Sequence, residues 1–231
     1  DLFNIDGGYY AMEIGGGNQV PDIKTSNSNF STITDQSNVS DNESTEVLRE
    51  NDVFDGTQHG SNEHYLISST DIFSGNPGAI DDMSDTTGIS GKEYKSITYG
   101  GAELYLITQD GYVYSSSDGS NWSVVDSDAI DQEPRKSSAA VVTIESKEYL
   151  IVGVEDGGYY ELNITDATND VVTPTETVDT DTANNFAAKY PELASATVFD
   201  VYPSADTPGE FYLGTENGLW KRTSNGEFQR Q

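Results

Sequence analysis

The 231-residue sequence contains no cysteine, only two histidines and only 11 basic residues. Without cysteine, neither a disulfide framework nor a cysteine metal site can form. No run of about 18 apolar residues occurs, so no membrane-spanning helix is expected. The chain begins at Asp1, and no signal peptide is visible, which suggests a processed or trimmed product.

Acidic residues outnumber basic residues by 40 to 11, and the formal net charge is −29. This charge excludes a nucleic acid partner, because nucleic acid binding depends on Lys and Arg side chains that neutralise phosphates. It disfavours an anionic membrane surface for the same reason. The acidic residues are spread along the whole chain, which favours a halophilic source, either haloarchaeal or a haloarchaeal virus. An acidic tail or a cation-binding region is the alternative explanation.

A pattern of short strands and turns is clearest between residues 104 and 125. Leu104–Ile107 has strand composition, the Gln109-Asp110-Gly111 sequence predicts a turn, and the apolar run that follows it predicts the returning strand. A polar loop then leads to Trp122, where a further strand begins. We therefore expect residues 94–125 to form one antiparallel four-stranded sheet with Trp122 buried against it.

Similar units recur along the chain, and each contains an anchoring tyrosine: Tyr10, Tyr65, Tyr105, Tyr149 and Tyr212. The two middle separations, 40 and 44 residues, match the roughly 40–45 residues of a four-stranded propeller blade. Candidate innermost strands precede three of the tyrosines, at 95–99, 140–144 and 197–202. The sequence predicts an all-β fold, a single β-propeller domain over residues 1–231 with five four-stranded antiparallel blades. Four-bladed and six-bladed versions are the alternatives.

The loop Ser116-Ser117-Asp118-Gly119-Ser120-Asn121-Trp122 resembles the Asp-box, or BNR repeat, of sialidases and many other β-propellers. The match lies at Ser116, Asp118, Gly119 and Trp122, while looser copies begin at Thr25 and Thr223. The resemblance implies a structural role for these residues on the propeller rim. It does not extend to sialidase activity, since the Arg-Ile-Pro motif of that family is absent and only four arginines occur.

Two polar segments, at about 34–64 and 166–195, break the repeat, and we expect neither to supply a repeat strand. The second ends in a candidate short helix at 183–190. Long loops on a rigid scaffold are common binding sites, although solvated decoration is the alternative interpretation. On the binding interpretation, the candidate partner-binding residues are Phe54, His59, His64, Phe186 and Tyr190.

Candidate chemistry is sparse in this sequence. A glycoside hydrolase would need two carboxylates at the central channel, for which Asp200 and either Asp55 or Glu145 are conceivable. Calcium could bind through the oxygen ligands of Asp126-Ser127-Asp128 or Asp179-Thr180-Asp181, although neither matches an EF-hand loop. No cofactor is expected, and the sequence leaves any metal site undefined. Five N-glycosylation patterns, including those at Asn121 and Asn163, are either coincidental or indicate a surface protein.

These observations favour a non-enzymatic surface recognition or structural module, such as a halophilic adhesin or receptor-binding propeller. The expected location is extracellular, on a cell surface or on a virion surface. The expected partners are a host-surface glycan, an envelope protein or neighbouring structural subunits in an oligomeric assembly. A secreted glycoside hydrolase with channel carboxylates is the alternative.

The excess negative charge predicts a dependence of stability on salt. Repulsion among exposed carboxylates weakens when the screening length falls from about 10 Å at 0.1 M salt to about 3 Å at 1 M. The melting temperature should therefore rise as KCl increases from about 0.1 M to several molar. A flat or falling melting temperature over this range would contradict the halophilic interpretation and favour a specific cation-binding role.

Overall fold

The structure is a computed structural model, and it describes most of the chain from Asp55 onward together with four strands before it. The described residues are 2–5, 8–13, 22–26, 33–35, 55–59, 63–76, 79–83, 86–125, 130, 133–165, 171–172, 186–204 and 206–231. Side chains are described only from Asp55 onward, with the exception of those at positions 63, 64, 76, 79–82, 137, 171 and 172.

The strands form five antiparallel sheets of four strands each, and every sheet is a meander in chain order. The first sheet contains β1 (Leu2–Ile5), β2 (Gly8–Glu13), β3 (Asp22–Ser26) and β4 (Ile33–Asp35). The second contains β5 (Asp55–His59), β6 (Glu63–Ile67), β7 (Ile72–Asn76) and β8 (Ala79–Asp82). The third contains β9 (Tyr94–Gly100), β10 (Glu103–Thr108), β11 (Val113–Ser116) and β12 (Ser123–Val124).

The remaining two sheets complete the chain. The fourth contains β13 (Pro134–Ile144), β14 (Lys147–Val154), β15 (Tyr159–Asn163) and β16 (Val171–Val172). The last contains β17 (Val198–Pro203), β18 (Phe211–Thr215), β19 (Gly218–Arg222) and β20 (Phe228–Arg230). Two short helices, α2 (Phe186–Lys189) and α3 (Pro191–Ala194), precede the last sheet.

Both faces of the third sheet are buried against neighbouring sheets. Successive side chains of a strand point to opposite faces, so each strand contributes to both. On β10, Leu104 and Leu106 pack with residues of the second sheet, such as Tyr65 and Ile67. The alternating residues Tyr105 and Ile107 pack instead with residues of the fourth sheet. One strand therefore contributes to two separate hydrophobic clusters.

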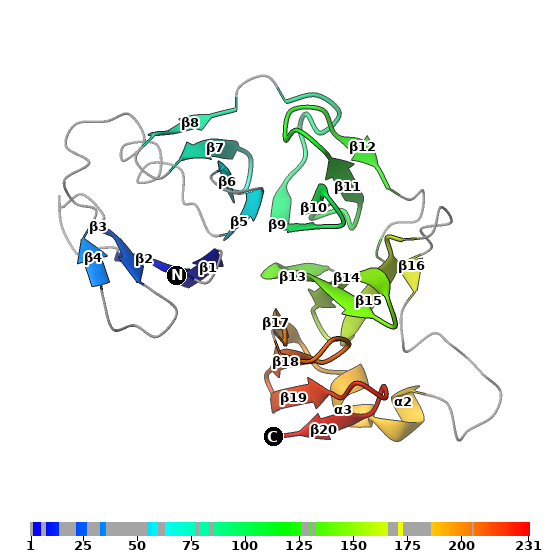
Figure 1. Cartoon of the computed structure of the whole chain (residues 1–231). Helices are drawn as coiled ribbons and strands as arrows, with labels where there is room; N and C mark the ends of the chain where they lie inside the picture. Colours follow the sequence, from blue (N-terminus) through cyan, green and yellow to red (C-terminus); the bar gives the residue numbers. More distant parts are fainter. Residues whose placement is uncertain are drawn as a thin grey trace.

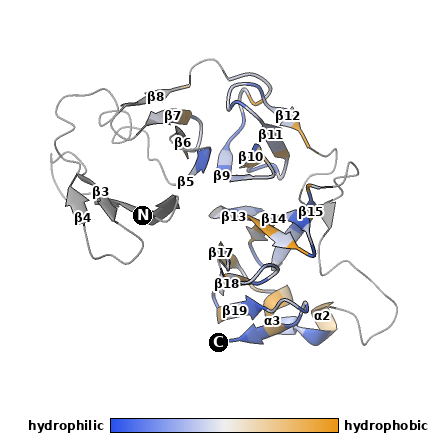
Figure 2. Ribbon diagram, in the orientation of Figure 1, coloured by the Kyte–Doolittle hydropathy of each residue, from blue (hydrophilic) through white to orange (hydrophobic). Residues whose placement is uncertain are grey.

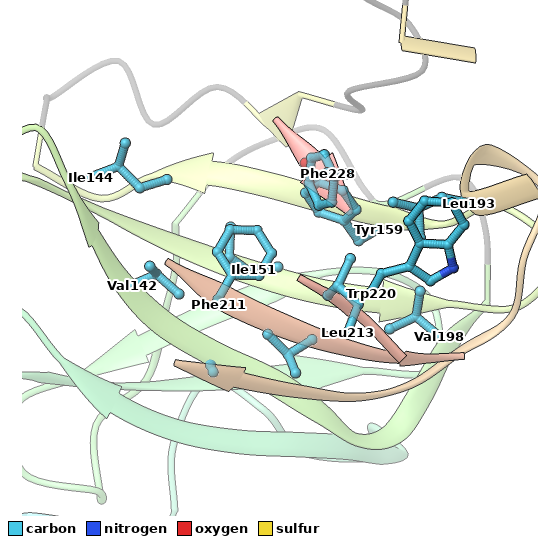
Figure 3. Packing of buried hydrophobic residues seen from close by; sticks show 12 residues of the cluster. Val142, Ile144, Ile151, Tyr159, Leu193, Val198, Phe211, Leu213, Trp220 and Phe228 are labelled. Carbon is cyan, nitrogen blue, oxygen red and sulfur yellow. The ribbon is translucent and has the colours of Figure 1, made fainter. Parts of the chain in front are cut away.

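The fourth and last sheets share a third cluster, shown in Figure 3. Trp220 of β19 lies beside Leu193 of α3 and Val198 of β17, so the helix closes one end of this cluster. The strand β14 in the fourth sheet is strongly hydrophobic, whereas β20 at the outside is largely hydrophilic (Figure 2).

The sheets are arranged as a β-propeller, as the sequence predicts. Figure 1 shows them one after another along an arc, with β5, β9, β13 and β17 toward the middle. Each innermost strand contacts the next: β1 with β5, β5 with β9, β9 with β13 and β13 with β17. Contacts of comparable extent do not join the described strands of the first and last sheets. The count of five blades in a closed ring therefore stays a prediction.

The third sheet spans Tyr94 to Val124 and contains no helix, and Trp122 is only 5% exposed, so the prediction for residues 94–125 is confirmed. The expectation for the two polar segments was wrong, because each contains a strand of a sheet. Segment 34–64 includes all of β5, and segment 166–195 includes β16. The polar sequence Asp-Gly-Thr-Gln-His of β5 concealed this strand, since an innermost strand can be held by backbone pairing and polar contacts rather than by apolar side chains.

Two short helices, instead of the one predicted, lie at the end of the second polar segment. The helix α2 begins at Phe186, a second helix begins at Pro191, and residues 183–185 of the predicted helix lie outside the described residues. Proline at the start of α3 is compatible with its first turn but prevents continuation of α2, because proline lacks the N–H group that a continuous helix requires.

The predicted turn between β10 and β11 gives a test of the fold. Gly111 has φ +82°, and a Cβ atom there would lie 2.2 Å from the carbonyl oxygen of Ile130. Gly111→Ala should therefore destabilise the domain by about 3 kcal/mol, through left-handed strain and a backbone collision. Gly91→Ala is the matched control, since Gly91 has φ +73° but no atom within 4 Å of the added Cβ, and about 1 kcal/mol is expected. Equal losses in chemical denaturation would contradict this packing.

Candidate functional site

Two of the three candidate channel carboxylates lie on innermost strands. Asp55 is the first residue of β5, and Asp200 lies on β17. Glu145 occupies an exposed left-handed position in the turn between β13 and β14, with φ 49°. Glu145 therefore lies at the end of the innermost strand β13, in the turn that leads to β14.

Asp55 is buried and engaged within the protein. Its Oδ2 accepts hydrogen bonds from Ser96 Oγ at 2.6 Å and from the Ile97 N–H at 2.9 Å, while Oδ1 accepts from the Gly56 N–H at 2.9 Å. Burial raises the pKa of Asp55 to about 7, although these hydrogen bonds oppose the shift. Desolvation also raises the pKa of Asp200, which repels Asp55 electrostatically. In this geometry the carboxyl group of Asp55 connects β5 with β9 through hydrogen bonds and does not face a substrate.

The Asp118 loop holds itself together through its own polar groups. The Asp118 Oδ1 atom accepts the N–H groups of Ser120 at 2.9 Å and Asn121 at 2.8 Å. The Ser116 hydroxyl accepts the Gly119 N–H at 2.9 Å, and the Trp122 indole donates to the Gly119 carbonyl at 2.7 Å. The backbone and side-chain donors of Asn121 and the Ser120 N–H hold the pKa of Asp118 well below its usual range.

The same loop is fastened to the second sheet. Tyr65 Oη donates to the Asp118 carbonyl at 3.2 Å, and a Cβ atom at Gly119 would collide with the Tyr65 ring. The Thr87 N–H donates to the Ser120 carbonyl, and the Thr87 carbonyl accepts the Trp122 N–H. The Asp118 loop is therefore a polar clasp at the outer strands, and it lies away from the innermost strands that carry Asp55 and Asp200.

The candidate partner-binding residues are largely occupied by intramolecular packing where they are described. The rings of Phe186 and Tyr190 lie 5.5 Å and 5.4 Å from the ring of Phe228, and Tyr190 Oη donates to Glu227 at 2.7 Å. The His59 ring lies edge-on to Tyr99 at 4.9 Å. These contacts cover part of the surface of Phe186, Tyr190 and His59, and their role in binding a partner stays a prediction.

Phe54, the side chain of His64, and both candidate calcium segments, Asp126–Asp128 and Asp179–Asp181, lie outside the described residues. Among the residues that are described, no group of three or more His, Cys, Asp or Glu side chains could hold a metal ion. Within the same residues, no helix is long and apolar enough to cross a membrane.

Sequence reasoning missed an exposed apolar surface on the last sheet. Four large hydrophobic residues are strongly exposed among the described side chains, and three of them belong to this sheet: Phe199 at 46%, Tyr202 at 46% and Leu219 at 45%. The strand register places Tyr202, Tyr212 and Lys221 in one row across β17, β18 and β19, with Leu219 in the adjacent row. We call these four residues the outward face.

The outward face is opposite to the face that packs on the fourth sheet. Leu213 and Trp220 alternate with its residues along β18 and β19, and both are buried in the shared cluster. The Lys221 ammonium lies 5.7 Å from the centre of the Tyr212 ring and pairs with Glu210 at 2.7 Å, which raises the pKa of Lys221. The outward face therefore combines apolar rings with one paired cation. The signal in the sequence was the alternation of large side chains on β18 and β19, which implies two apolar faces.

The clasp gives a prediction for Asp118. Asp118→Ala should lower the melting temperature at pH 7, because several loop N–H groups lose their acceptor. Since folding lowers the pKa of Asp118, its stabilisation is present above about pH 4 and is lost as the pH falls toward the folded-state value. The difference between wild type and variant should therefore shrink in acid. Asp206→Ala removes another exposed carboxylate and is the control; an equal effect of both changes would rule out the clasp.

Solved structures with a similar fold are only distantly related in sequence. Virginiamycin B lyase from Staphylococcus aureus has a TM-score of 0.58 and 11% identity, over 98% of this chain and 66% of the lyase chain. A chain of a nidogen/laminin complex has a TM-score of 0.58 and 13% identity, over 98% of this chain and 76% of that one. YCF48 bound to a D1 peptide has a TM-score of 0.55 and 13% identity, over 96% of this chain and 64% of YCF48.

These likenesses establish the fold alone, since an enzyme and binding proteins match about equally well. This chain spans about two-thirds of the length of the lyase and YCF48 chains. A comparison with curated protein sequences finds no match. The model of the DUF6242 β-propeller domain matches residues 23–193, which is well over half of the sequence, and the chain therefore belongs to the DUF6242 β-propeller family.

Proposed function

We propose that this propeller is a non-enzymatic recognition module that binds a protein partner through the outward face. The observation that carries the proposal is the concentration of exposed apolar side chains on the last sheet. Exposed hydrophobic residues that occur singly are ordinary, but a group of them on one surface indicates an interaction site. Tyrosine also suits such a site, since it offers a large apolar surface with little loss of side-chain entropy.

The packing of the other sheets indicates the chemistry of the partner. Tyr105 and Tyr149 stand on β10 and β14 at positions that correspond to Tyr212 on β18, and each packs toward the following sheet. The cluster in which Tyr105 is buried contains mostly aliphatic side chains of the next sheet, including Leu150 and Val152, together with Tyr160. By the same logic, the outward face suits a β-structured protein segment that presents aliphatic side chains. A glycan offers fewer apolar groups and is the weaker match.

The size of the outward face limits the affinity that it can provide. Three strands spaced about 4.8 Å apart and about five residues long present about 240 Å². A standard protein interface buries about 800 Å² on each partner, so the outward face alone supports weak binding. Phe199 of β17 is exposed as well, but its ring lies 5.3 Å from the guanidinium of Arg135 on β13, so it is not counted in the outward face.

Two structural relatives support a binding role by analogy only. YCF48 is seen bound to a peptide, and nidogen is seen in a complex with laminin. We further propose that the domain acts at an exterior surface of a halophilic cell or virion. The net charge of −29 supports this setting, because such a charge keeps a protein soluble in concentrated salt. An envelope protein or a neighbouring structural subunit would then be the natural partner.

The proposal predicts that loss of two apolar side chains weakens binding. A photoreactive phenylalanine analogue at position 219 would first identify the partner by crosslinking in envelope extracts of the source organism. The purified partner would then be titrated calorimetrically against Tyr202→Ser/Leu219→Ser. We expect the dissociation constant to rise at least tenfold, since each buried apolar side chain contributes about 1 kcal/mol or more.

Val124→Ser is the matched control, because Val124 is 49% exposed on β12 of the third sheet. The control should change the affinity less than twofold, and both proteins should keep the wild-type melting temperature. Unchanged affinity of the double variant would overturn the proposal. So would crosslinking only to carbohydrate, or only to a second copy of this chain. Release of sugar from a glycan substrate would establish the hydrolase instead.

A further inference from the structure

The carboxyl group of Asp55 joins the innermost strands of two neighbouring sheets. Asp55 starts β5 in the second sheet, whereas Ser96 and Ile97 belong to β9 in the third sheet. Their hydrogen bonds to Asp55 Oδ2 measure 2.6 Å and 2.9 Å, and both are buried. Asp55 and Ser96 are only 9% and 1% exposed. Water can therefore do little to stabilise a charge on this carboxyl group.

We propose that Asp55 is a pH-sensitive link, which holds the second and third sheets together when its carboxyl group is neutral and loosens them when it ionises. In the neutral form, the carboxyl group donates its proton to Ser96 Oγ and still accepts the N–H groups of Ile97 and Gly56. In the ionised form, Ser96 donates in the opposite direction, and a negative charge lies between the sheets. The hydrogen bond between Asp55 Oδ2 and Ser96 Oγ, 2.6 Å apart, therefore persists in both forms, and the buried negative charge is what loosens the two sheets.

Among the side chains that the structure describes, no cation is seen to compensate a charge on Asp55. On β17, Asp200 is a second carboxylate and repels it. On β9, Lys95 is paired with Glu133 at 2.8 Å, and on β13, Arg135 is paired with Glu155. On β5 itself, His59 lies against Tyr99 and Tyr65. The strand β1 carries no ionisable residue, and β6 pairs Ile67 with Asp55 while Glu63 and His64 pair with the opposite end of β5.

The raised pKa of Asp55 determines how the stability of the protein should change with pH. Burial raises the pKa of Asp55 from about 4 in the unfolded chain to about 7 in the folded protein. The stabilisation is therefore complete below about pH 4 and is lost as the pH rises to about 7. For these two values, the equilibrium constant for unfolding should increase about tenfold between pH 6 and pH 8.

The composition of the chain makes a change in stability between pH 6 and pH 8 easy to observe. Other side chains with ordinary pKa values near 7 are few, because the sequence has two histidines and no cysteine. In about 1 M KCl, the screening length of about 3 Å also suppresses repulsion among exposed carboxylates. A stability change between pH 6 and pH 8 in this buffer would then come from Asp55, from a histidine, or from Asp200 or Glu161, whose pKa values burial also raises.

The test combines a direct reporter with unfolding measurements on the full chain. The amide protons of Ile97 and Gly56 donate to Asp55, so their NMR shifts should titrate together with a midpoint near pH 7. The unfolding constant should rise about tenfold from pH 6 to pH 8 in wild type and in His59→Gln, but remain nearly flat in Asp55→Asn. Asp200→Asn should move the amide midpoint to lower pH, because it removes a repelling charge.

Each outcome decides the proposal, even if Asp55→Asn does not fold. Flat amide shifts between pH 5 and pH 9 in wild type, or a midpoint below pH 5, would overturn it. A pH dependence that disappears in His59→Gln would assign the effect to the histidine and overturn it as well. Ser96→Ala removes a hydroxyl partner of Asp55, and it should shift the amide midpoint without abolishing the titration.

Discussion

The fold depends on the burial of both faces of each inner sheet by its neighbours. Side chains alternate along β10, so that Leu104 and Leu106 pack on one neighbouring sheet while Tyr105 and Ile107 pack on the other. The same alternation on β14 places Leu150 and Ile151 in different clusters. Each sheet therefore requires two neighbours. In the part of the chain that the structure describes, no neighbouring sheet covers Tyr202 and Leu219, which are exposed on the outward face of the last sheet.

Two aspartates connect the second and third sheets, one at the outer strands and the other at the innermost strands. Asp118 acts at the outer strands through its loop and Tyr65, whereas Asp55 acts at the innermost strands through Ser96 and Ile97. Both carboxylates accept backbone N–H groups, yet their pKa values shift in opposite directions. Asp118 is exposed, so hydrogen bonding dominates and lowers its pKa. Asp55 is buried, so desolvation dominates and raises it.

The outward face is a second candidate surface for recognition, besides the two long polar segments that the sequence indicates. Long polar segments were the obvious candidates from the sequence, but the described part of the second one contributes Phe186 and Tyr190 to packing around Phe228. These aromatic rings stabilise the last sheet from one side, which leaves its other side available. The proposed binding surface thus lies on the strands of the last sheet.

The sequence by itself determined the propeller fold, the third sheet and the burial of Trp122, because these follow from local alternation, glycine turns and a repeated spacing. It named Asp55 and Asp200 as conceivable channel carboxylates, but it could not reveal that Asp55 is bonded to Ser96 and Ile97. It also missed β5, whose residues are polar. Only the tertiary structure decided these points and the exposure of Tyr202 and Leu219, because burial, hydrogen-bond partners and the presence of a neighbouring sheet depend on contacts between residues far apart in the chain.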